Sequence, residues 1–153
     1  MANKIWREKR FFPLLATQFL GAFNDNLFKN TLMVFVAYRL LADAQTVNIY
    51  ANLAAGIFIL PYFLFSAFAG LLADKYSRSQ LARILKISEL VLMIAAAVIF
   101  MFNSPNLLIF MLFLMGLQST FFGPIKYALL PQLLKQNELV AGNAYVEAST
   151  YIS

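Results

Sequence analysis

The sequence contains neither cysteine nor histidine. Without cysteine no disulfide can form, and the residues give no sign of the redox compartment. The two absences together exclude a cysteine nucleophile, a serine–histidine pair and a histidine-based metal site within these 153 residues. They also remove the general base that a membrane acyltransferase of the histidine–aspartate kind requires. We therefore expect no enzyme activity and no cofactor from this stretch of sequence.

Charged residues are scarce as well. They make up 12% of the chain, whereas soluble domains carry about 25%, and 61% of the residues are hydrophobic. The net charge of +5 does not indicate nucleic acid, because the basic residues gather between apolar stretches rather than among aromatics on a soluble element. The sequence predicts membrane lipid as a partner and no nucleic acid.

Hydropathy predicts an all-α, polytopic membrane protein with four transmembrane helices and the start of a fifth. After an N-terminal tail, 1–10, the expected spans are 11–41, 50–73, 84–102, 105–128 and an incomplete 140–153. A helix needs about 20 apolar residues to cross a hydrocarbon core about 30 Å thick, and the fifth stretch is shorter. We expect the chain to be the N-terminal part of a longer transporter. A four-span protein with an interfacial C-terminal helix is the alternative.

The distribution of lysine and arginine predicts an orientation. Ten of these residues fall in the tail and near the loops after the second and fourth spans, and only Arg39 falls in the opposite loops. Loops rich in lysine and arginine stay on the cytoplasmic side. The N-terminus is therefore expected to be cytoplasmic. The ten residues are Lys4, Arg7, Lys9, Arg10, Lys75, Arg78, Arg83, Lys86, Lys126 and Lys135.

Polar side chains interrupt the first span near its midpoint. Helical spacing predicts one face that holds Gln18, Gly21, Ala22, Asp25 and Lys29, with Asn26 beside it. Asp25 and Lys29 are one turn apart in the order that favours an ion pair. A charge at that depth costs about 2.5–3.5 kcal/mol and usually faces a wet cavity with a functional role. The alternative is a structural cluster that bonds between helices and fixes their packing.

A second polar cluster ends the second span. It consists of Gly70, Asp74, Lys75 and Arg78. Such charges can form a latch that holds one conformation, or they can be an ordinary solvated loop. The pair Ser66 and Gly70 also predicts a close approach between helices, because small residues four apart let two backbones come together.

The later spans hold three further features. Gly123–Pro124 interrupts the fourth apolar stretch, either as a hinge or as the end of the helix. Glu147 would lie about 11 Å beyond Val140 along a helix, inside the membrane, which suggests a cavity. Lys86 and Glu89, one turn apart near the start of the third span, are interpreted as an interfacial pair.

Two sets of residues resemble known families. The residues Gly70, Asp74, Lys75 and Arg78 resemble the cytoplasmic loop motif of the major facilitator superfamily of secondary transporters. Ser77 and Ser79 depart from it, where a glycine and a basic residue are usual. The segments QFLGAFNDNLFKN (18–30), GPIKYALLPQLL (123–134) and GNAYVEAST (142–150) resemble the lysophospholipid transporter branch, whose members occur alone or fused to acyltransferase and acyl-activating domains.

This resemblance implies a transporter of the bacterial inner membrane that moves lysophospholipid by alternating access, together with further helices of a longer chain. It implies a substrate pathway of Gln18, Asp25, Asn26, Lys29, Lys126 and Glu147, and a gating role for the loop motif. A zwitterionic headgroup needs one anionic and one cationic site, which Lys29 with Asp25 or Glu147 would supply. The alternatives are a proton-coupled transporter of another small solute, and a non-transporting four-span scaffold.

Overall fold

The structure is a computed structural model that describes residues 5–39 and 43–153. Within these ranges the regular elements are all helices and there is no strand, which confirms the predicted all-α fold class. The long helices are α1 (Phe12–Val34), α2 (Ala44–Lys75), α3 (Arg78–Met101), α4 (Pro105–Leu133) and α5 (Leu139–Ile152). The short elements are a 3-10 turn at Ile5–Arg7, a π-helical turn at Phe35–Arg39 that continues α1, and a 3-10 turn at Gln136–Glu138.

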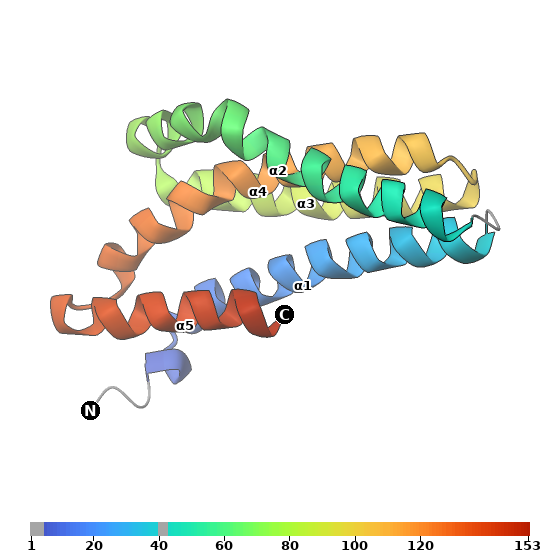
Figure 1. The fold of residues 1–153 in the computed structure, drawn as a ribbon. Helices are drawn as coiled ribbons and strands as arrows, with labels where there is room; N and C mark the ends of the chain where they lie inside the picture. The colour runs from blue at the N-terminus through green and yellow to red at the C-terminus, as the bar shows by residue number, and fades with distance from the viewer. Residues whose placement is uncertain (1–4, 40–42) are drawn as a thin grey trace.

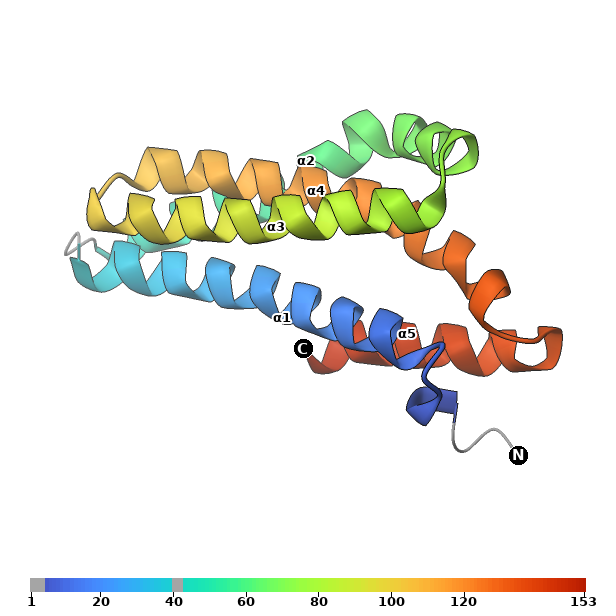
Figure 2. The same ribbon diagram turned by 180° about the vertical axis from the view of Figure 1, so that it is seen from behind.

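The helices form two groups. Helices α2, α3 and α4 pack together, and α1 lies beside them with α5 along its N-terminal half (Figures 1 and 2). Two apolar clusters hold the bundle. One includes Phe11, Leu14 and Val146, and the other includes Phe28 and Leu112. On α1 and α4 the polar residues described below lie largely between these two clusters.

Three helices, α2, α3 and α4, are long and apolar enough to cross a membrane among the described residues. Helix α1 has 23 residues, but its polar positions from Asn24 to Asn30 lower its hydropathy. Only 6% of the most apolar window of α3 is buried inside the protein. This distribution, with apolar side chains on the outside, suits a lipid environment.

The observed helices are longer than the spans that hydropathy predicted. Helix α2 begins at Ala44 rather than near 50, and α3 begins at Arg78 rather than near 84. Asp43 accepts a hydrogen bond from the backbone N–H of Thr46 at 3.2 Å and caps α2 outside its apolar part. Hydropathy detects the apolar middle of a helix, whereas backbone hydrogen bonding continues into polar flanks. The predicted end of the first span, residue 41, lies outside the described residues.

Helix α4 continues through both of its internal prolines, Pro124 and Pro131, and ends at Leu133. The suggestion that the helix ends at Gly123–Pro124 is therefore wrong. The C-terminal part of α4 instead bends away from α3 and leads down to α5 (Figures 1 and 2). A proline inside a helix removes one hydrogen bond and displaces the preceding turn, which accounts for a bend in this region.

Helices α2 and α4 approach each other closely at Gly116, not at Gly70. A methyl group on Gly116 would collide with the backbone carbonyl oxygen of Phe58 on α2. A methyl group on Gly70 would meet no other described atom within 4 Å. The close contact predicted at Ser66 and Gly70 is thus absent from the described residues, and α2 and α4 meet through a glycine on the other helix.

Candidate functional site

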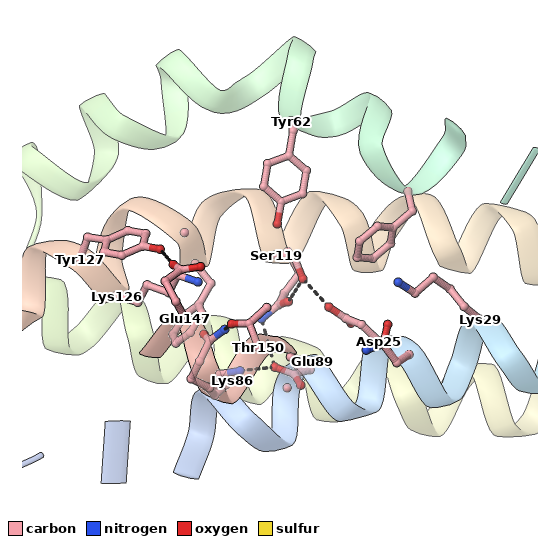
Figure 3. Close-up of a pocket in the computed structure, with 18 residues that line it drawn as sticks. Asp25, Lys29, Tyr62, Lys86, Glu89, Ser119, Lys126, Tyr127, Glu147 and Thr150 are labelled. Atoms are coloured by element: carbon pink, nitrogen blue, oxygen red, sulfur yellow. Dashed lines mark hydrogen bonds and ion pairs between the residues drawn. The ribbon is translucent and has the colours of Figure 1, made fainter. Parts of the chain in front are cut away.

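A polar cavity of about 380 Å³ lies between the helices. All six predicted pathway residues line it, and the helical face predicted on α1 points into it (Figure 3). Residues from α2, α3, α4 and α5 complete the wall. The lining residues are Gln18, Gly21, Ala22, Asp25, Asn26, Lys29, Phe58, Tyr62, Lys86, Glu89, Gln118, Ser119, Phe122, Gly123, Lys126, Tyr127, Glu147 and Thr150.

Asp25 and Lys29 both face the cavity but have different direct partners. The Ser119 hydroxyl donates a hydrogen bond to Asp25 Oδ2 at 2.9 Å. Lys29 Nζ lies 4.6 Å from the centre of the Phe58 ring. Within residues 5–39 and 43–153, the ion pairs join Lys86 to Glu89, and Arg10 to Glu8 and Glu138. The direct Asp25–Lys29 pair that the spacing favours is therefore not formed, so both charges are available to a ligand.

Lys86 and Glu89 form an ion pair in the cavity wall. Their atoms Nζ and Oε2 are 2.6 Å apart, and the two side chains are 21% and 14% exposed. Gln118 Nε2 donates to the same Glu89 oxygen at 3.2 Å, and Lys86 Nζ lies 4.3 Å from the Phe122 ring centre. The one-turn spacing of the two residues predicted an interfacial pair, and the pair is formed. Because α3 begins at Arg78, Lys86 lies two turns inside the helix.

Lys126 and Glu147 lie toward the far end of the cavity from Lys29 (Figure 3). The Tyr127 hydroxyl donates a hydrogen bond to Glu147 Oε1 on α5. Lys126 Nζ lies 5.0 Å from the Tyr127 ring centre. Gln18 Nε2 donates to the Thr150 hydroxyl at 2.8 Å and so joins α1 to α5. These contacts bring α5 into the wall through its polar side chains.

Among the described residues, the cavity is lined by three lysines and three carboxylates, so its formal charge is zero. Sequence reasoning found Lys29, Lys126, Asp25 and Glu147. It did not assign Lys86, Glu89, Ser119 or Tyr62 to the cavity. The one-turn spacing of Lys86 and Glu89 within an apolar stretch could have indicated that they line the cavity. The two hydroxyl residues had no such signal, because a single serine or tyrosine is common in any helix.

The predicted gating motif lies outside the cavity, at the end of α2. Arg78 Nη1 donates a hydrogen bond to the backbone carbonyl of Ala128 on α4 at 3.1 Å. Asp74 and Lys75 are exposed, and Lys75 Nζ lies 5.7 Å from the ring centre of its neighbour Tyr76. Among the described residues, Arg78 thus links the motif to another helix by a hydrogen bond. That contact lies three residues before Pro131.

A separate contact ties the N-terminal segment to the turn between α4 and α5. Arg10 Nη2 and Glu138 Oε2 are 2.8 Å apart. The backbone N–H of Lys135 also donates to Glu138 Oε2 at 2.8 Å. The Lys135 hydrogen bond, and then the positive charge of Arg10, lower the pKa of Glu138 below its ordinary value of 4.5.

Comparison with known proteins identifies the family. The model of the Major Facilitator Superfamily matches residues 14–153. The chain belongs to this superfamily. Similar curated proteins include the lysophospholipid transporters LplT of Citrobacter koseri, 30% identical over 149 residues, and of Escherichia fergusonii, 29% identical over 149 residues. Each match covers 97% of this chain and 34% of the relative. No solved structure matches the chain.

The family and the three apolar helices together make this an integral membrane protein of a transporter family. The chain spans about a third of the length of the curated relatives that it matches. The loop motif and the three segments noted in the sequence all fall within the matched residues.

Proposed function

We propose that the chain is the N-terminal part of a secondary transporter that moves a lysophospholipid across the bacterial inner membrane. The observation that carries this proposal is the cavity, which brings three cations and three anions together between helices whose outer faces are apolar. Charges at membrane depth are costly and are usually kept for a substrate or ion path. The similarity to transporters named for lysophospholipid supports the substrate class.

The charges suit a zwitterionic headgroup. Lys29 has no carboxylate partner among the described ion pairs, and it provides a site for the phosphate. Asp25 or Glu147 provides a site for the ammonium group. The acyl chain stays against the apolar helix faces, so dehydration of the headgroup is the main barrier that the cavity lowers.

We propose alternating access, in which one bundle rocks against another around a central site. Arg78 holds the bent end of α4 through the Ala128 carbonyl, and this contact is suited to a gate that breaks when α4 moves. The loop motif Gly70, Asp74, Lys75 and Arg78 then acts as the gating element at the end of α2.

We also propose that the N-terminus is cytoplasmic. Lys86 and Lys126 line the cavity and do not belong to the loops, so removal of these two from the ten basic residues leaves eight against Arg39. The excess of lysine and arginine therefore remains on the side of the N-terminal tail. The bond between Arg10 and Glu138 also agrees, because it requires the tail and the turn after α4 to lie on one side.

Uptake of labelled lysophospholipid into membrane vesicles tests the function. The protein is expressed from its complete reading frame, with Asp25→Asn and Lys29→Met as variants. Both are expected to reduce uptake at least about tenfold, since each removes one headgroup charge. Asn30→Ala serves as the control, because Asn30 lies on α1 but is exposed and does not line the cavity. Undiminished uptake in both variants would remove these residues from the mechanism.

A further inference from the structure

The Lys86–Glu89 pair is the part of the cavity that the proposed function leaves without a role. It lies on α3, whose most apolar stretch is only 6% buried inside the protein. Several neighbours hold the pair in place. Gln118 donates to Glu89, and Gly21 on α1 leaves room for the lysine, since a methyl group there would come within 2.6 Å of Lys86 Nζ.

Two hydrogen bonds and one longer polar contact lead from this pair to Asp25. Ser119 Oγ lies 2.9 Å from Asp25 Oδ2 and 3.4 Å from Gln118 Oε1, and the Gln118 amide donates to Glu89. A hydroxyl has one proton to donate, so the shorter contact to Asp25 takes it. Gln118 is only 7% exposed and also donates to the Leu85 carbonyl at 3.2 Å, which fixes its orientation. The pair therefore stands a short, rigid distance from the proposed headgroup site.

Structural stability does not explain the pair. Replacement of a buried ion pair by neutral groups of similar size is often neutral or stabilising, whereas removal of one partner is costly. A pair retained in a substrate cavity is better explained by its effect on the charge that the ligand meets. With both groups ionised, the six charged side chains of the cavity cancel. Loss of Glu89 alone leaves one positive charge in excess, and loss of Lys86 alone leaves one negative charge.

We propose that the Lys86–Glu89 pair sets the net headgroup charge that the cavity accepts. This inference rests on the proposed function and names a specificity element within the same site. With the pair intact, a ligand that carries no net charge leaves the cavity balanced. With one partner removed, a ligand of opposite net charge restores the balance, because interactions between charges are strong in a cavity of low effective dielectric. Gln118 is a positioning residue that holds Glu89 against Lys86.

The test compares two lysophospholipids that share one acyl chain and differ in headgroup, ethanolamine with no net charge and glycerol with one negative charge. The measured quantity is the ratio of uptake efficiency for the two lipids, with the complete protein in vesicles. Glu89→Gln is expected to shift the ratio toward the anionic lipid by at least about tenfold, and Lys86→Gln is expected to shift it the other way. The double variant removes both charges and is expected to return the ratio close to that of the wild type.

Three further proteins complete the test. The reversed pair, Lys86→Glu with Glu89→Lys, keeps the cavity neutral and is expected to keep the wild-type ratio. Glu8→Gln removes a partly exposed carboxylate outside the cavity and is expected to leave the ratio unchanged. Gln118→Leu, which frees Glu89 without a change in charge, is expected to lower uptake of both lipids with a smaller shift in ratio. Each single variant tests the proposal on its own, so misfolding of one leaves the other decisive.

Two outcomes would overturn the inference, and a third would overturn the proposed function as well. An unchanged ratio in the folded single variants shows that the pair does not select headgroup charge. A double variant that keeps the shifted ratio of a single variant shows that charge balance is not the cause. Failure of the wild-type protein to take up either lipid defeats the proposed function itself, and the inference with it.

Discussion

Each lysine in the cavity lies against an aromatic ring. Lys29 lies 4.6 Å from the centre of Phe58, Lys86 lies 4.3 Å from Phe122, and Lys126 lies 5.0 Å from Tyr127. The electron-rich face of a ring attracts a cation, by about 2 kcal/mol or more where water is excluded. This contact stabilises an ammonium group without neutralising it. Lys29 thus has a favourable contact without a direct bond to Asp25, and its N–H groups remain available to a phosphate.

The close packing of α2 on α4 depends on Gly116, which has no side chain. Gly116→Ala is expected to destabilise the protein by about 1–3 kcal/mol, because the new methyl group would force the Phe58 backbone away. Gly56→Ala on α2 is the matched control. Its methyl group meets no described atom within 4 Å, and alanine favours a helix by up to about 1 kcal/mol. Thermal unfolding of the detergent-solubilised protein should separate the two variants, and equal melting temperatures would contradict the described contact.

Among the elements, α1 and α4 each supply six of the residues that line the cavity. Those of α4 include Gln118, Ser119 and Lys126, and this helix also contains two prolines. Sequence patterns predicted the helical class, the polar face of α1 and the carboxylate on α5. They placed the fourth span at 105–128 but left open whether Gly123–Pro124 is a hinge or an end, because a proline is compatible with either a kink or an end. They predicted the Lys86–Glu89 pair, which is formed, but not that it lines the cavity. Spacing shows that two residues share a helix face, but only the packing of three helices shows what that face meets.

The bend of α4 is expected to matter for transport more than for stability. Pro124→Ala restores a backbone hydrogen bond and straightens the helix, so stability should stay the same or rise by up to about 3 kcal/mol. Uptake should fall several-fold, since the end of α4 that Arg78 contacts would be displaced. Pro13→Ala is the control, because Pro13 lies in the first turn of α1, where proline is tolerated. A straightened α4 with full uptake would show that the bend is not part of the transport cycle.

The turn between α4 and α5 provides a prediction about pH. Because the folded-state pKa of Glu138 is lowered, this group stabilises the fold above its ordinary value of 4.5, and that contribution is lost as the pH falls through the lowered pKa. Glu138→Gln should therefore melt below the wild type at neutral pH, and the difference should disappear in acid. Glu8→Gln keeps the hydrogen bond from Lys135 to Glu138 and is expected to lose less stability at neutral pH. A constant difference between wild type and Glu138→Gln at every pH would contradict this role.

At the scale of the whole molecule, charged side chains gather inside and large apolar side chains lie outside, the opposite of the distribution in a soluble protein. The charged side chains of α1, α3, α4 and α5 meet in a cavity, while large apolar side chains such as Phe63 on α2, which is 82% exposed, cover the outside. An apolar groove between α1 and α5, which includes Phe19 and Leu20, lies on the other side of α1 from the cavity. For transport, water must therefore reach the cavity face of α1 while the groove face is kept from water.

Cysteine labelling measures this difference directly, because the chain has no cysteine of its own. Ala22→Cys places a thiol in the cavity, and Leu20→Cys places one on the apolar groove, where Leu20 is 61% exposed. The protein in intact membranes is treated with a membrane-impermeant, water-soluble thiol reagent, with and without lysophospholipid. We expect Ala22→Cys to react and to be protected by the lipid, and Leu20→Cys to remain unlabelled. Failure of Ala22→Cys to react from either side of the membrane, or equal labelling at the two positions, would contradict the central claim that the charged face of α1 lines a hydrated substrate cavity.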